Sequence, residues 1–386
     1  MITEALRQSH LIAAARAKWL AQSKSPMQAA TLPDPQITVQ NMAVGNAIPG
    51  NRLQTSNFAY FGYGVTQKIP YPGKLELRAA VKQKDAEAAR QDYLARQRQV
   101  VEQVRETYFN LFYLSRALHV LQRTHGDFES LAHITESQYE VGTAQQQDVL
   151  KAQLEMTKVL KQIEVTREEF GQAQDNLKAI LGREQDSPEI PIGDVRLTPF
   201  KLDTRELRKL ALHDSPELRK AHKLEAASEE SLKLADEGYI PDLTFSYMYQ
   251  KTGERFPDYY MATIGVSIPL YFWRKQTPAV EQAGLNRESA QARTYATRLS
   301  VFSRVQNQLL AIQTDARLAQ VYSQGLIPQA EATLRSAMGT YRVGKIDFQT
   351  LLSAEIDVLT LKQQYFRTIA DHEIAIARIQ QITGLP

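Results

Sequence analysis

Tyr139-Glu-Val-Gly142 and Tyr341-Arg-Val-Gly344 are two copies of one turn, and they lie 202 positions apart, at 139 and 341. The same spacing separates Gly182 from Gly384, the glycines that close the stretches opened by these turns. Between turn and glycine the recurring residues are Gln147, Leu150, Ala152, Gln162, Thr166, Ala173 and Ile180, which return as Gln349, Leu352, Ala354, Gln364, Thr368, Ala375 and Ile382. A period this long excludes short solenoid repeats. It predicts a chain of two equivalent halves.

We place these halves at 1–201 and 202–386, because hydrophobic periodicity and the positions of Gly and Pro predict one order of elements in both. That order is helix, two strands, long helix and return helix. The first half is expected to hold them at about 2–23, 36–44, 58–69, 74–138 and 146–181. The second half is expected to hold them at about 205–237, 242–250, 259–269, 275–340 and 347–383, with a kink at Pro328. A helix of about 65 residues is roughly 100 Å long, which no compact globular domain accommodates.

The predicted strands have two different faces. In the second half, apolar side chains alternate with small or polar ones. One face is expected to carry Leu243, Phe245, Tyr247, Ile264, Val266 and Ile268. Each strand has about 9 to 12 residues, the length that a tilted strand needs to cross a bilayer. Open strand edges are not tolerated in lipid, so four membrane-spanning strands require several chains to share one barrel. The alternative is a small soluble sheet packed on the helices.

Composition and motif content argue against most other classes of protein. The chain carries 46 Lys and Arg against 43 Asp and Glu, interspersed along the sequence, so we expect an ordinary solvated helix surface and no nucleic-acid partner. The absence of cysteine excludes disulfides and thiolate sites. The seven histidines are scattered without metal-ligand spacing. We therefore expect no metal, no cofactor and no enzymatic activity.

The sequence shows no helical membrane anchor and no leader. No apolar run approaches the ~18 residues of a membrane helix, and the start, Met1-Ile-Thr-Glu-Ala-Leu6, lacks the basic region and apolar core of a signal peptide. Taken alone, this start is typical of a cytoplasmic protein. The strands favour instead a mature chain whose signal sequence is absent from this sequence.

Six short runs lie within this repeated order of elements. They are Leu32-Pro-Asp-Pro-Gln-Ile37, Ile69-Pro-Tyr-Pro-Gly-Lys74, Val104-Arg-Glu-Thr-Tyr108, Tyr139-Glu-Val-Gly-Thr143, Ser215-Pro-Glu-Leu-Arg219 and Tyr341-Arg-Val-Gly-Lys345. With these runs, the chain resembles the TolC-like outer-membrane factor family, the outer membrane efflux proteins. The resemblance extends from Glu4 to Gly384.

The resemblance implies a mainly α-helical protein with a β-barrel part. Long antiparallel helical hairpins are expected to form an α-barrel tunnel in the periplasm, and four transmembrane strands per chain to build a twelve-stranded barrel in a homotrimer. The implied function is a passive exit duct in the outer membrane, which receives substrate from an inner-membrane pump through a periplasmic adaptor, in efflux or type I secretion. Two of the runs look most like members that serve heavy-metal or related resistance-nodulation-division pumps.

The resemblance also assigns candidate sites. Adaptor docking is expected at the turn residues Val141, Gly142, Thr143, Val343, Gly344 and Lys345. In the best-known members acidic residues just after the second turn narrow the tunnel mouth, but the matching positions here are Thr350 and Ser353. Asp148, with Asp357 below it, is then the candidate for the constriction; the alternative is that Asp148 only caps its helix.

Two readings stay open at this point. Many family members carry an N-terminal cysteine for lipid attachment and this sequence has none, so a lipid anchor is either absent or removed with the leader. A soluble coiled-coil adaptor or scaffold is the competing function. The two-faced strands and the loops between them argue against it.

Overall fold

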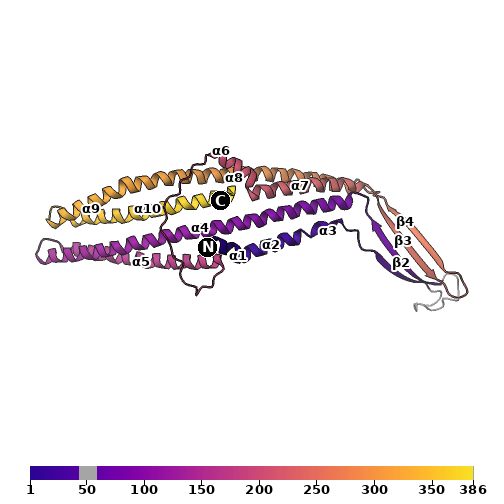
Figure 1. Cartoon of the computed structure of the whole chain (residues 1–386), viewed down its shortest axis with the longest axis horizontal. Coiled ribbons are helices and arrows are strands. Elements are labelled where there is room, and N and C mark those ends of the chain that lie inside the picture. Colours follow the sequence, from indigo (N-terminus) through magenta and orange to yellow (C-terminus); the bar gives the residue numbers. More distant parts are fainter. Residues whose placement is uncertain (43–58, 386) are drawn as a thin grey trace. The chain divides into compact units, whose positions relative to one another are not determined.

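The computed structural model describes residues 1–42 and 59–385 (Figure 1). Elements before residue 200 are α1 Ile2–Gln8, α2 His10–Gln22, α3 Ser25–Ala30, β1 Gln36–Met42, β2 Tyr60–Ile69, α4 Lys74–Glu140 and α5 Gln146–Leu181. Those after it are α6 Thr204–Asp214, α7 Pro216–Asp236, the 3-10 turn η1 Glu237–Tyr239, β3 Asp242–Lys251, β4 Tyr259–Ser267, α8 Gln276–Val321, the π-helical turn η2 Tyr322–Leu326, α9 Ile327–Arg342 and α10 Phe348–Thr383. The predicted strand residues Ala43, Val44 and Phe58, and the loop 45–57, lie outside the described residues.

Two compact units divide the chain. We call them the hairpin unit, made of Met1–Ala15, Tyr93–Pro216 and Arg298–Pro386, and the strand unit, made of Arg16–Asp92 and Glu217–Thr297. Both units take residues from both halves of the sequence. The described residues therefore group by position along the helices and not by half.

The two long helical stretches differ from each other. α4 runs for 67 residues without proline, roughly 100 Å, as expected. The second stretch, expected over 275–340 with a kink at Pro328, is interrupted at that proline, because η2 separates α8 from α9 just before it. Proline lacks the N–H of the helical ladder and its ring clashes with the carbonyl four residues earlier, which a wider turn relieves. Among residues 1–42 and 59–385, no helix combines the length and the apolar character that a membrane span requires.

The first helix of each half is also broken. The helix expected over 2–23 stops at Ser9, and the one expected over 205–237 stops at Ser215, both in extended conformation. For Ser215 the cause is Pro216, since the residue before proline is driven out of the helical region. Asp203 starts α6 through a capping box, in which its carboxylate accepts from the Glu206 N–H at 2.7 Å.

Aromatic and aliphatic side chains of four helices form one of three buried clusters in the described part of the hairpin unit. Phe128 and Leu131 of α4 pack with Phe348 and Leu351 of α10, all almost fully buried. α10 is packed along most of its length, whereas α5 leaves several aliphatic side chains exposed, namely Leu150, Leu154, Leu160 and Val165. The two hairpins, α4–α5 and α9–α10, therefore share one core through α4 and α10.

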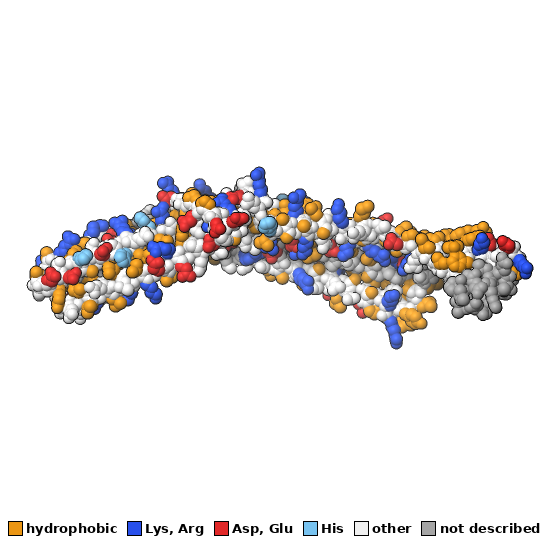
Figure 2. Space-filling view, turned by 90° about the horizontal axis from the view of Figure 1, so that it is seen from below, with side chains coloured by type: hydrophobic (Ala, Val, Ile, Leu, Met, Phe, Trp, Pro, Cys, Tyr) orange, Lys and Arg blue, Asp and Glu red, His pale blue; other side chains and the backbone are white. Residues whose placement is uncertain are grey.

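The strand unit contains a four-stranded antiparallel sheet in the order β1-β2-β3-β4, with β1 and β4 at the edges. Hydrophobic side chains gather over these strands, while charges of both signs are interspersed over the helices (Figure 2). In the same unit α7 lies against α4 through ion pairs of Lys220 with Asp92 and Lys223 with Glu87, each 2.8 Å.

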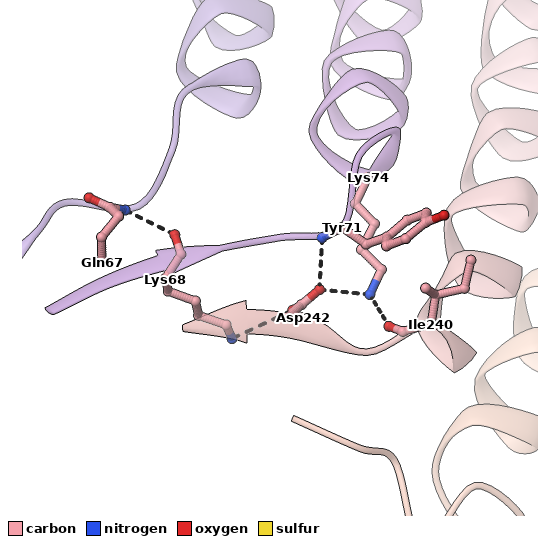
Figure 3. A network of polar contacts seen from close by, with 6 residues as sticks. All are labelled: Gln67, Lys68, Tyr71, Lys74, Ile240 and Asp242. Atoms are coloured by element: carbon pink, nitrogen blue, oxygen red, sulfur yellow. Dashed lines mark hydrogen bonds and ion pairs between the residues drawn. The ribbon is translucent and has the colours of Figure 1, made fainter. Parts of the chain in front are cut away.

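A polar network fixes the junction between sheet and helices (Figure 3). The ammonium group of Lys74, at the start of α4, donates to the Ile240 carbonyl at 2.5 Å and to the Asp242 carboxylate at 2.8 Å. The same carboxylate accepts from the Tyr71 N–H at 3.2 Å, and the Lys68 ammonium lies 3.8 Å from its second oxygen. The side chains of Lys74 and Asp242 are only 8% and 17% exposed, so the pair is largely removed from water.

Candidate docking tips, channel mouth and membrane face

The two turns predicted to dock an adaptor have the same backbone geometry. Gly142 and Gly344 adopt φ of 78° and 69°, in the left-handed region that favours glycine. The N–H of Gly142 donates to the Tyr139 carbonyl at 2.9 Å and that of Thr143 to the Gln138 carbonyl at 2.8 Å. Gly344 and Lys345 repeat both bonds at 2.9 and 3.1 Å. Each turn is therefore a Schellman motif, which ends a helix by satisfying its last carbonyls.

The side chains beside these glycines point to solvent. Val141 is 74% exposed and Val343 66%, and Lys345 is exposed. Thr143 is exposed too, although its hydroxyl donates to the Gln138 carbonyl at 3.0 Å. Exposed valines at a tight turn contribute nothing to the core of the hairpin unit. They are free to contact another protein.

A groove of about 500 Å³ joins the two turns, which lie side by side within the hairpin unit (Figure 1). Its lining includes Thr143 and Asp148 from the first turn and Val343, Gly344 and Asp347 from the second. The structure therefore brings both predicted turns, and one predicted mouth residue, to a single place.

The two acidic residues at the starts of the return helices differ in role. Asp347 is the N-cap of α10, and its carboxylate accepts from the Thr350 N–H at 2.8 Å and from the Thr350 hydroxyl at 2.5 Å. Asp148 lies inside the first turn of α5, whose N-cap is Gln145, and no side-chain cap bond forms there. Asp148 therefore does not act as an N-cap, although its charge still favours a helix N-terminus.

The other predicted mouth residues share one face of α10. Thr350, Ser353 and Asp357 follow the spacing of a helical stripe and all three are exposed. Thr350 is partly engaged by the Asp347 cap. Asp357 is the one carboxylate among these three.

A buried carboxyl group, which the sequence did not single out as a site, lies in the same helix. Glu355 of α10 is 2% exposed, and its Oε2 has no hydrogen-bond partner among the described residues. Burial raises the pKa of Glu355 to about 7, and the negative charge of Asp127 on α4 adds to the rise, against the opposing Lys362 and Arg123. No spacing rule signals this group, because its burial comes from packing between α4 and α10.

The register of the sheet collects its large apolar side chains on one face. Val65, Tyr247 and Ala262 lie directly opposite one another, and so do Gln67, Phe245 and Ile264. The exposed apolar residues of this face are Ile37, Val39, Tyr63, Val65, Ile69, Leu243, Phe245, Tyr247, Tyr260, Ile264 and Val266. Ile268 is exposed just beyond the end of β4. An exposed apolar patch of this extent marks a surface that contacts lipid or protein.

The opposite face of the sheet is small and polar near the helices, and carries Met248 opposite Met261 farther along the strands. Thr66, Ser246 and Thr263 form one of its rows, and Thr244 faces Gly265 in another. Alternation between an apolar and a polar face is the pattern of a membrane strand with one side to lipid and the other to a wet lumen. Within the described residues no group of three His, Cys, Asp or Glu is placed to hold a metal ion.

Comparisons with known proteins agree with this architecture. The family model of the outer membrane efflux proteins matches residues 1–183 and 207–385. No curated protein matches the sequence.

Solved outer-membrane proteins have the same fold. The outer-membrane channel OprN superposes with a TM-score of 0.85 at 16% identity, over 99% of this chain and 88% of that one. The outer membrane protein VceC from Vibrio cholerae gives 0.83 at 16%, over 99% and 95%. The CmeC outer membrane channel from Campylobacter jejuni gives 0.83 at 16%, over 99% and 84%. Both the helices and the sheet thus have counterparts in solved outer-membrane proteins.

Proposed function

Because the chain belongs to the outer membrane efflux protein family and is an efflux channel of the bacterial outer membrane, we propose that three copies form one passive exit duct. This duct receives substrate from an inner-membrane pump through a periplasmic adaptor, and no catalytic step is part of its action. The observation that carries the proposal is the sheet, which has an exposed apolar face, a polar face and two edge strands, β1 and β4, whose outer edges pair with no described strand.

The open edges require partner strands. β1 and β4 each present a row of unpaired N–H and C=O groups, which cost several kcal/mol each in hydrocarbon. Pairing β4 of one copy with β1 of the next removes both edges and closes a barrel. Four strands from each of three copies give twelve. The apolar face, including Phe245 and Val266, then meets lipid, and the face with Thr244 and Ser267 lines the lumen.

The paired turns are the surface for the adaptor. A trimer presents six turns of nearly the same shape, two from each copy, which suits a partner that offers repeated helical hairpins. Val141, Thr143, Val343 and Lys345 are exposed around glycines that fix the backbone. We assign the docking contact to these four side chains and the turn geometry to Gly142 and Gly344.

Mass measurement in detergent tests the assembly. The purified chain is expected to run as a trimer and to conduct ions in planar bilayers. A monodisperse monomer with an intact sheet would contradict the proposal.

Substitution at the turns tests docking separately. Two double variants are used, Val141→Lys with Thr143→Lys and Val343→Asp with Lys345→Asp. Each is expected to abolish efflux in cells while the trimer yield stays unchanged. The matched control is Thr333→Lys, because Thr333 is also exposed and its hydroxyl also donates to a helix carbonyl, that of Gln329 at 3.0 Å. Efflux that survives all four substitutions would remove the docking assignment.

A further inference from the structure

We propose that the seam between copies repeats the contact between β2 and β3, so that β4 of one copy pairs with β1 of the next with Ile264 opposite Val39. In this seam the carboxylate of Asp34 forms an ion pair with Arg274 and Lys275 of the neighbouring copy. The inference rests on the proposed trimer. It adds the register and an ion pair between copies.

Inside one chain, the contact between the two halves has a strand part and a charged part. β2 and β3 pair antiparallel, with Val65 opposite Tyr247. At the end of this ladder Lys74 donates to Asp242 and to the carbonyl of Ile240. The acceptors belong to the run Ile240-Pro241-Asp242, which leads from a helix into a strand.

The other half contains the same acceptor run. Leu32-Pro33-Asp34 leads from α3 towards β1 as Ile240-Pro241-Asp242 leads towards β3. Asp242 lies opposite Ser267, the residue before Ile268-Pro269. Continuing the β1–β2 register by two residues puts Asp34 opposite Lys68, the residue before Ile69-Pro70. Asp34 therefore occupies the position that Asp242 occupies in the second half.

The cationic side has a counterpart as well. Lys74 ends a turn in which its N–H donates to the Tyr71 carbonyl at 3.1 Å, and Arg274 ends a turn in which its N–H donates to the Tyr271 carbonyl at 3.0 Å. Each turn leads from a strand into a long helix. Lys275 follows directly, so this junction carries two positive charges where the first half carries one.

These counterparts have no side-chain partners within residues 1–42 and 59–385. Asp34, Arg274 and Lys275 are exposed, and none of them forms a side-chain hydrogen bond or an ion pair with another described residue. The negative charge lies beside the open edge of β1 and the positive charges beside the open edge of β4. A second copy joins these edges and charges at once.

The transferred register keeps the two faces of the sheet intact. In this transfer Ile268 takes the place of Ile69, and Asp34 takes the place of Asp242. Val65 precedes Ile69 by four residues and Tyr247 follows Asp242 by five. The corresponding pair between copies is therefore Ile264 with Val39. By the same count Val266 meets Ile37, and on the other face Gly265 meets Thr38. In the pairs Ile264–Val39 and Val266–Ile37 apolar residues meet apolar ones, and in the pair Gly265–Thr38 two small residues of the polar face meet. A slip by one residue would place the apolar set of one strand against the polar set of the next.

Disulfide trapping tests the register, and the chain has no cysteine of its own to interfere. Directly opposite residues of antiparallel strands have Cα atoms about 4.5 to 5.5 Å apart, which suits a disulfide. Oxidised trimers of the Ile264→Cys, Val39→Cys double variant are expected to migrate as a covalent trimer after denaturation. The one-residue slip is represented by Ile264→Cys with Thr38→Cys, which is expected to stay monomeric. The internal pair Val65→Cys with Tyr247→Cys is expected to oxidise without a gain in mass.

Charge exchange tests the ion pair. Asp34→Lys is expected to lower trimer yield several-fold, and adding Arg274→Asp and Lys275→Asp is expected to restore it. Glu254→Lys, an exposed charge in the loop between β3 and β4, is the control and is expected to leave yield unchanged. If the variant with all three substitutions does not recover the trimer yield, the ion pair is overturned.

The outcomes also separate this inference from the trimer itself. Native trimers that give no cross-link at Ile264 and Val39, or that cross-link in the slipped pair, overturn the seam but leave the proposed function standing. A monomeric unsubstituted chain overturns both.

Discussion

The ammonium nitrogen of Lys74 lies 2.8 Å from a carboxylate oxygen of Asp242, although 168 residues separate the two in the sequence. The pair joins the first residue of α4 to the first residue of β3, and the Tyr71 N–H and the Ile240 carbonyl complete it. It closes the β2–β3 ladder at the point where prolines end the strand pairing. One ion pair thus joins the junction between β2 and α4 to the start of β3, which belongs to the other half of the sequence.

Removing the cation of this pair is expected to destabilise the strand unit. Lys74→Met leaves the Asp242 carboxylate partly buried without its main partner, and we expect a loss of about 2–3 kcal/mol. Thermal melting of the purified trimer measures it. Lys82→Met is the control, because the Lys82–Asp85 pair at 3.2 Å is exposed and such pairs contribute about 0–1 kcal/mol. Equal melting temperatures for both variants would contradict the role assigned to Lys74.

Arginine on the apolar face of the sheet is expected to block membrane insertion. Phe245→Arg or Val266→Arg places a charge in lipid at a cost of about 2–4 kcal/mol near the midplane. Thr244→Arg and Ser267→Arg lie on the polar face and are expected to be tolerated. The amount of trimer in isolated outer membranes measures the difference. Equal amounts for the two pairs would show that neither face meets lipid.

Side chains at the turn glycines are expected to strain the hairpins. Gly142→Ala and Gly344→Ala force an L-residue into the left-handed region, at about 1–2 kcal/mol each. No neighbouring atom lies within 4 Å of the added carbon, so strain is the only cost. Gly126→Ala is the control: Gly126 lies inside α4 with equal space, and alanine there is expected to stabilise by about 0.5–1 kcal/mol. A lower melting temperature in all three variants, including Gly126→Ala, would contradict this account.

Glu355 is expected to make stability fall as pH rises. The folded state holds its proton up to a pKa of about 7, whereas the unfolded state loses it near 4.5. Stability is therefore full below pH 4.5, declines between 4.5 and 7, and stays reduced above 7. Glu355→Gln removes this decline, worth on the order of 2–3 kcal/mol at pH 8, and raises the melting temperature there but not at pH 4. Asp357→Asn, on the exposed side of α10, is the control and is expected to leave the melting temperature unchanged at both pH values.

Asp148 is expected to influence ion selectivity if three copies bring it to the channel mouth. Convergent carboxylates attract cations, so Asp148→Asn is expected to reduce cation selectivity and block by multivalent cations in planar bilayers. Asp347→Asn is the comparison, since Asp347 is engaged as the α10 cap. Unchanged selectivity in an Asp148→Asn trimer would leave only the helix N-terminal charge effect.

The sequence alone determined the elements whose causes are local. The return helix predicted over 146–181 is α5. Its bounds are local, because Gly142 ends the preceding helix and Gly182 ends α5 itself, both with positive φ. The faces of β3 and β4 follow from the two-residue period of a strand, so Phe245 and Ile264 fall on one face as predicted. The turns Tyr139–Gly142 and Tyr341–Gly344 share a geometry because their glycines and backbone bonds are the same.

Tertiary structure decided what depends on residues far apart in the chain. The runs Pro72-Gly73-Lys74 and Ile240-Pro241-Asp242 were visible in the sequence, but nothing local predicts that Lys74 and Asp242 meet. The burial of Glu355 likewise comes from α4 packing on α10. Backbone conformation is set by neighbours along the chain, whereas pairing and burial are set by which surfaces pack together, and only the folded chain fixes those.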